Sequence, residues 1–159
     1  MNARRITSVA AAAALAAGLA AGPAQAATAH HHHHHRALTH HWAGARIGAV
    51  QYNSPGRDTG TNRSLNREWV AIVNDSPRAV DLAGWTLRDA NHNVYRFGHV
   101  WLDAHRSLKV HTGRGRDTRT DLYQDRYRYE WNNNGDVATL RNARGRVVYQ
   151  VSWGWEVRR

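Results

Sequence analysis

The chain is 159 residues long, which accommodates one domain, and its 22 lysines and arginines against 12 aspartates and glutamates give a formal net charge of +10. The absence of cysteine excludes disulfides, thiol catalysis, iron–sulfur clusters and cysteine zinc sites, so the core alone must stabilise the domain. Lys109 is the only lysine, so the positive charge is almost entirely guanidinium, which suits phosphate, carboxylate and aromatic partners but also fits an arginine-biased, otherwise ordinary surface.

Residues 1–26 have the three parts of a secretory signal peptide. Arg4-Arg5 give a positive start, Ile6–Ala21 is an alanine-rich apolar run, and Ala24–Ala26 supplies small residues for the peptidase. This run is short and weakly apolar for a membrane span, which needs about 20 strongly apolar residues. We expect cleavage after residue 26, by the general or the twin-arginine route. Removing 26 of 159 residues, two of them arginines, leaves 133 residues with a charge of +8. We expect this mature chain to have no transmembrane anchor and to lie outside the cell.

The next part, residues 27–43, is predicted to be a disordered, histidine-rich linker. Neutral imidazoles bind zinc, copper and nickel, but consecutive histidines in a flexible arm give no fixed coordination geometry, so we expect incidental metal affinity. The run gains charge as the pH falls through about 6.5. A natural linker and an engineered tag both remain open. The candidate metal ligands are His30, His31, His32, His33, His34 and His35.

Residues 44–155 alternate short apolar stretches with turn residues, and no stretch has helical period and adequate length. This pattern predicts an antiparallel, all-β sandwich, followed by a basic end at residues 156–159. Two long polar loops are expected at Asn53–Asn66 and Thr112–Asp121. The expected strands are Arg46–Tyr52, Trp69–Val73, Val80–Leu82, Trp85–Leu87, Val94–Phe97, Ser107–His111, Val137–Leu140 and Val147–Trp153.

Three details of the sandwich follow from single residues. On Glu68–Asn74, alternation places Val70 and Ile72 inward. Gly84 is expected to let the chain turn between two sheets, with Trp85 and Leu87 in the core. The pair Asn134-Gly135 is typical of a type I′ hairpin turn.

Several of these segments together resemble the lamin tail domains of exported bacterial proteins. The resemblance covers about Ile47 to Trp153 and implies an immunoglobulin-like β-sandwich with no known enzymatic centre and no cofactor. It further implies an interaction module, since the lamin domain is described as binding nuclear partners including DNA, and bacterial members occur alone or attached to hydrolases. The segments that carry it are Asp58–Asn74, Val80–Asp89, Val94–Phe97, Leu108–Gly115 and Trp131–Arg141.

The residues themselves offer little catalytic chemistry. No Gly-x-Ser-x-Gly motif occurs, and the glutamates Glu68, Glu130 and Glu156 show no pattern of two carboxylates facing across a cleft. His105 and His111 could approach each other, although solvated edge positions are the simpler interpretation. Aspartates 117, 121 and 125 alternate with arginines, which indicates local ion pairing more than a calcium loop. We expect a protein that is not an enzyme.

The stretch from Arg114 to Trp131 interleaves arginines with aromatic residues. Guanidinium groups neutralise phosphates, and aromatic faces stack on bases or sugars. The same residues could instead pack the end of the sandwich, with the arginine stems covering the aromatic rings. The candidate binding residues are Arg114, Arg116, Arg119, Arg126, Arg128, Tyr123, Tyr127 and Tyr129.

The sequence therefore favours a secreted, non-catalytic binding module for a polyanion, either nucleic acid or an anionic cell-wall polymer. The alternative is a protein-interaction or adhesion module that uses an exposed sheet edge. Carbohydrate binding, or service as an accessory domain of a hydrolase, is the third hypothesis.

Overall fold

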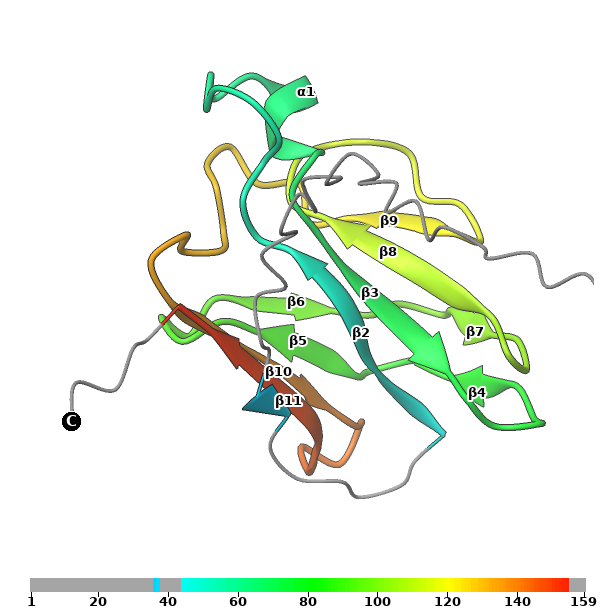
Figure 1. Cartoon of the computed structure of the whole chain (residues 1–159). Helices are drawn as coiled ribbons and strands as arrows, with labels where there is room; N and C mark the ends of the chain where they lie inside the picture. The colour runs from blue at the N-terminus through cyan, green and yellow to red at the C-terminus, as the bar shows by residue number, and fades with distance from the viewer. Residues whose placement is uncertain (1–35, 38–43, 155–159) are drawn as a thin grey trace, which may run out of the picture. The chain divides into compact units, whose positions relative to one another are not determined.

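The computed structural model describes residues 36–37 and 44–154, the first two by their backbone alone. The predicted signal peptide, the histidine run His30–His35 and the basic end at 156–159 lie outside the described residues. Within them, eleven strands and one short helix are present, which confirms the all-β fold class. Figure 1 shows the strands in two main sheets and one small one.

The first sheet has four strands in the order β2-β3-β8-β9. The central strand β3 buries Val70 and Ile72 completely, as alternation predicts. Strand β2 has an irregular register between Ile47 and Val50, where a Cβ on Gly48 would lie 2.6 Å from Val73 Cγ2. The bounds are Ala45–Gln51 for β2, Trp69–Asn74 for β3, Ser107–His111 for β8 and Asp121–Tyr123 for β9.

Strand β9 departs from the predicted antiparallel pattern, because it pairs with β8 in parallel, from Lys109↔Asp121 to His111↔Tyr123. Parallel neighbours need a connection that carries the chain back to the starting end of the first strand. Residues 112–120 form that connection without a helix. The sequence identified this stretch as a polar loop, but its composition does not encode the direction of return.

The second sheet has five strands in the order β1-β11-β10-β5-β6. It contains two hairpins: β10 and β11 join through Asn142–Gly145, and β5 and β6 join through a turn in which Asp89 Oδ1 accepts from the Asn93 amide at 2.7 Å. Strand β1 lies within residues 27–43, predicted as a linker. The bounds are Arg36–Ala37 for β1, Thr86–Arg88 for β5, Val94–Arg96 for β6, Asp136–Arg141 for β10 and Val147–Trp153 for β11.

A small sheet of two strands links the two larger ones at one end of the sandwich. Strands β4 (Val80–Asp81) and β7 (Trp101–Leu102) pair antiparallel. The chain then passes from β4 to β5 through Gly84, whose φ of +75° is easily adopted only by glycine. This confirms the turn predicted between sheets.

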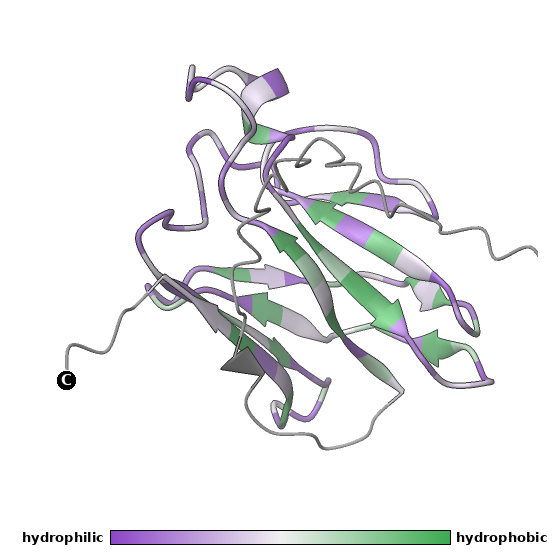
Figure 2. Cartoon of the chain, in the orientation of Figure 1, coloured by the Kyte–Doolittle hydropathy of each residue, from purple (hydrophilic) through white to green (hydrophobic). Residues whose placement is uncertain are grey.

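The core lies between the two main sheets and draws on both of them. Ile72 and Val110 of the first sheet belong to the same buried cluster as Leu87 and Leu140 of the second, with Trp85 beside them. Burying each large apolar side chain contributes roughly 1.5–3 kcal/mol. Figure 2 shows the apolar residues concentrated on the strands and the polar ones on the loops.

Two local predictions were wrong. The loop 53–66 contains a single helical turn, α1 (Asn62–Leu65), because Thr61 caps it by accepting from the Ser64 amide at 3.3 Å and Leu65 is buried beneath it.

The turn before β10 is not a type I′ hairpin. Strand β10 pairs with β11 and β5, so the preceding turn joins no hairpin partner. Asn134 is not among the described non-glycine residues with positive φ, and the φ of Gly135 is 152°. The turn is held instead by Asn132, whose carbonyl accepts from the Gly135 amide at 3.3 Å and whose Oδ1 accepts from the Asn134 amide at 2.9 Å.

Candidate functional site

The predicted binding residues all lie between the end of β8 and the start of β10. We call residues 114–129 the arginine–tyrosine segment. Its side chains divide into two groups. Tyr123, Arg126 and Tyr129 are half-buried, whereas the exposed members are Arg114, Arg116, Arg119, Tyr127 and Arg128.

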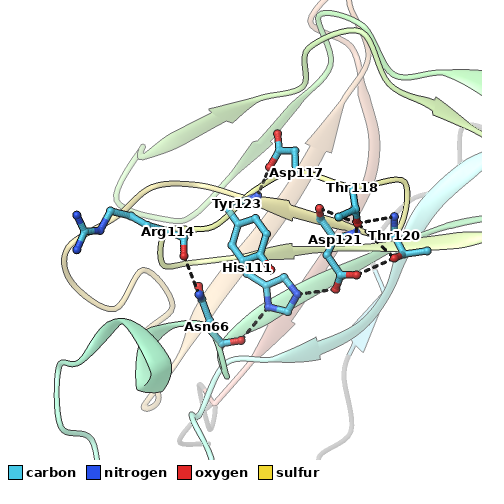
Figure 3. A network of polar contacts seen from close by, with 8 residues as sticks. All are labelled: Asn66, His111, Arg114, Asp117, Thr118, Thr120, Asp121 and Tyr123. Carbon is cyan, nitrogen blue, oxygen red and sulfur yellow. Dashed lines mark hydrogen bonds and ion pairs between the residues drawn. The ribbon is translucent and has the colours of Figure 1, made fainter.

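Helix α1 fixes the start of the arginine–tyrosine segment. Asn62 and Asn66 each donate from Nδ2 to the carbonyl oxygen of Arg114, at 2.8 and 2.9 Å, and Asn62 Oδ1 accepts from the Arg114 amide at 2.7 Å. A Cβ on Gly113 would lie 2.5 Å from Asn66 Oδ1, so only glycine allows this close approach. The backbone of Arg114 is therefore held while its side chain is exposed (Figure 3).

A polar network connects β8 to β9 beside this point (Figure 3). The ring of His111 stacks on Tyr123, with centroids 5.1 Å apart; its Nδ1 lies 2.8 Å from the Asn66 carbonyl oxygen and its Nε2 lies 2.9 Å from Asp121 Oδ1. Both ring nitrogens thus face oxygen atoms, which hold the ring between Asn66 and β9. Hydrogen bonds from Thr120 and His111 hold the pKa of Asp121 below its usual value.

This network corrects two predictions. His111 is not a solvated edge residue, because its side chain is only 12% exposed. Its partner is Asp121 and not His105, which lies in the turn before β8 with a φ of 56°. Among the described residues, no ion pair joins Asp117, Asp121 or Asp125 to the arginines between them. Asp117 instead accepts from the Tyr123 amide at 2.9 Å.

The end of the arginine–tyrosine segment is attached to a buried carboxyl group that sequence reasoning missed. Glu68, at the entrance to β3, is 1% exposed. Its Oε1 accepts from the Thr112 hydroxyl at 2.6 Å, the Glu130 amide at 2.8 Å and the Trp131 amide at 3.3 Å. One oxygen therefore ties β3 to both ends of the connection between β8 and β10.

Glu130 lies beside it and is itself 8% exposed. Its Oε2 pairs with Arg126 Nε at 3.2 Å. Burial raises the pKa of Glu68 to about 7 against the hydrogen bonds it accepts, and the charge of Glu130 adds to the rise. Burial likewise raises the pKa of Glu130 to about 7, with contributions from Asp89 and Asp136 and opposed by Arg126. The pair acts as a buried anchor, since Glu68 Oε1 accepts from two backbone amides and Glu130 Oε2 pairs with Arg126, whereas Glu68 Oε2 is buried without a hydrogen-bond partner.

The exposed part of the segment presents a guanidinium stacked on an aromatic ring. Arg114 Cζ lies 4.8 Å from the ring centroid of Tyr127, whose side chain is 77% exposed. Tyr129 is held differently, because its hydroxyl bonds Ser64 Oγ at 2.6 Å and accepts from the Gly60 amide at 3.4 Å. The aromatic residues thus divide into an exposed ring, Tyr127, and the half-buried rings of Tyr123 and Tyr129, which contact neighbouring elements.

In the part of the chain that the structure describes, no group of three or more histidine, aspartate or glutamate side chains is arranged to hold a metal ion. The candidate ligands His30–His35 fall outside it. In the described part of the chain, no helix is long and apolar enough to cross a membrane.

Comparison with known proteins gives one result. A family model described as Lamin Tail Domain matches residues 43–154, which include every described strand except β1. No curated protein matches the chain.

Proposed function

This chain belongs to the lamin tail domain family, a non-catalytic, immunoglobulin-like type of interaction module, and from that premise we propose that it binds an extended polyanion through the arginine–tyrosine segment. The ligand would be nucleic acid or an anionic cell-wall polymer, met after secretion from the cell. No catalytic residue and no cofactor form part of the proposal.

The observation that carries the proposal is the stacked pair of Arg114 and Tyr127. An exposed ring with a guanidinium over it offers a flat face for a base or a sugar and a positive charge for the adjoining phosphate or carboxylate. Among the described residues, four arginines of the segment form no ion pair with a carboxylate, so their charge is available to a ligand: Arg114, Arg116, Arg119 and Arg128.

The way the segment is attached supports the same function. Asn62, Asn66 and Glu68 hold its backbone through hydrogen bonds at both ends. A backbone held before the ligand arrives reduces the entropy lost on binding. The exposed arginines are thus carried by a fixed backbone, which suits repeated phosphate or carboxylate groups along a polymer.

The alternative, a protein partner added at a sheet edge, has less support. In the four-stranded sheet the edge strand β9 has three residues, and the opposite edge strand β2 has an irregular register. Short and bulged edges discourage the addition of a strand. A partner that binds by strand addition would have little regular edge to extend.

Salt dependence tests the proposal. Four arginine–phosphate contacts with a single-stranded oligomer of 20 thymidines predict a slope of about −2.8 in log affinity against log salt, or about a 50-fold loss from 50 to 200 mM salt. Replacing one contacting arginine, as in Arg114→Ala, should lower the affinity about tenfold at 50 mM salt and make the slope shallower by about 0.7. Fluorescence anisotropy of a labelled oligomer measures both quantities.

The matched control is Arg144→Ala. Arg144 is equally an exposed arginine, but it lies in the turn between β10 and β11. We expect this variant to bind like the unmodified protein. Affinity that does not change with salt, or equal losses in the two variants, would contradict the proposal.

A further inference from the structure

A second site lies outside the Arg114–Tyr127 pair, at the end of the sandwich that carries the small sheet. A cavity of about 600 Å³ opens between β7, the start of β8 and the loop that precedes β9. Its volume falls within the range of about 300–1,000 Å³ that is usual for small-molecule sites. Trp101, Asp103, Arg106, Ser107 and Arg119 are among the residues that line it.

Leu102 and Thr120 of the lining belong to the fold, but the large and charged side chains around this cavity have few partners of their own. Trp101 is 64% exposed, and among the described residues its ring stacks on no other ring. In the same part of the chain, neither Arg106 nor Arg119 forms an ion pair, and Asp103 pairs with no cation. An exposed indole and two guanidinium groups without a carboxylate partner thus surround one hollow, and tryptophan and arginine are among the residues that most often dominate binding surfaces.

We propose that this cavity binds one acidic sugar residue of a polysaccharide. The face of Trp101 would stack on the sugar ring, as aromatic side chains do with flat or partly apolar ligands. Arg106 and Arg119 would hold the carboxylate, for which the guanidinium fork is the matched donor. Asp103 and the Ser107 hydroxyl would take hydrogen bonds from the sugar hydroxyl groups.

Asp103 decides between a sugar and a nucleotide. A carboxylate in the cavity accepts hydrogen bonds from ring hydroxyls, of which a sugar acid has several. It repels the phosphate monoester of a nucleotide, with a charge of about −2, more strongly than the singly charged carboxylate of a sugar acid, and the nucleotide carries fewer hydroxyls to compensate. The cavity chemistry therefore favours a carboxylated sugar. This assignment rests on the proposed function in one respect, since it makes the polyanion an acidic polysaccharide.

The test uses monomeric D-galacturonate as the probe, because a monomer can fill the cavity, whose lining includes neither Arg114 nor Tyr127. The chain is observed by NMR through its tryptophan indole N–H signals, and the Trp101 signal is assigned from the spectrum of Trp101→Phe. Galacturonate should shift this signal in a saturable way, and Arg106→Ala should weaken the affinity about tenfold or more. Neutral D-galactose should bind at least about tenfold more weakly, and thymidine 5′-monophosphate should not compete.

Each other outcome overturns the assignment. If galacturonate does not shift the Trp101 signal, the cavity does not bind the sugar. An equal response to galactose would show that the arginines do not recognise the carboxylate. Tighter binding of the nucleotide would identify the cavity as a nucleotide site. The variant Arg114→Ala should leave galacturonate binding unchanged, because Arg114 does not line the cavity. Loss of salt-dependent polymer binding with an intact galacturonate response would therefore count against the polyanion function alone, and the reverse result against the cavity alone.

Discussion

Strand β8 leads directly into the arginine–tyrosine segment, yet different forces order the segment and the strand pair β3–β8. The pair is in register over five residue positions and buries Val70, Ile72 and Val110 completely. The segment is largely exposed and is held by polar groups distant in sequence, such as Glu68, which lies 62 positions before Glu130. The comparison teaches that the scaffold depends on apolar burial, whereas the candidate binding segment depends on a few polar side chains that donate to and accept from its backbone.

The sharpest way to break the scaffold is to remove apolar volume from β3. Ile72→Ala should lower the free energy of unfolding by about 2–5 kcal/mol, because Ile72 is fully buried and its loss leaves a cavity between the sheets. Urea denaturation followed by tryptophan fluorescence measures the change. Val73→Ala is the matched control, since Val73 is half-buried on the opposite face of the same strand, and it should cost much less. Equal losses would mean that the core does not lie where the burial pattern places it.

Because Glu68 and Glu130 are buried, we expect the free energy of unfolding to fall as the pH rises towards neutrality. The pKa values of Glu68 and Glu130 are raised from 4.5 to about 7 in the folded protein, so between these values the folded state binds more protons than the unfolded state. Their stabilising contribution is therefore complete below about pH 4.5 and is lost as the pH rises through about 7. For one retained proton the loss amounts to about 3 kcal/mol.

Urea denaturation at intervals between pH 4.5 and 8 measures this loss, and Glu68→Gln is the control because it keeps an acceptor but cannot ionise. The variant should show a flatter profile. The window avoids Asp121, whose lowered pKa gives a contribution that is present above about pH 4 and lost only as the pH falls further. A free energy of unfolding that rises with pH across the window would contradict the assignment.

The smallest expected effect concerns the hydrogen bonds that hold the start of the arginine–tyrosine segment. Asn62→Ala removes two hydrogen bonds to the backbone of Arg114 and should cost about 1 kcal/mol. Hydrogen exchange should accelerate at the Arg114 amide and remain unchanged in β3. Asn133→Ala, at an exposed asparagine before β10, should change neither. An effect of Asn62→Ala that spread into β3 would show that the segment and the scaffold are one cooperative unit.

Most of the scaffold could be predicted from the sequence because it is locally encoded. The period of two along β3 and β8 identifies both strands and their inner faces, and Gly84 identifies the turn between sheets. The same period also indicates two buried polar residues that were not predicted: if Val70 and Ile72 point inward, Glu68 and Asn74 do so as well. Both are buried in the structure, and a carboxylate on an inward position predicts a polar anchor.

The candidate site was harder to predict because its geometry depends on contacts between distant residues. The identity of the exposed residues, such as Arg114 and Tyr127, follows from composition. The stacking of these two, the parallel return of β9 and the attachment of Glu130 to Glu68 depend on how the chain crosses the end of the sandwich. Alternating charges suggested ion pairs within the loop, whereas the structure uses Asp117 and Asp121 to fix neighbouring loops and His111.

The attachment of the segment to Glu68 also has a consequence for the order of folding. Contacts between residues 44 to 63 positions apart close large loops, and the entropy of closing them is recovered only once both ends have a surface to meet. Glu68 offers its acceptor in position only when β3 is already paired. The strands should therefore assemble first and the arginine–tyrosine segment last, so that a nascent chain acquires its scaffold before it acquires a surface with which to bind.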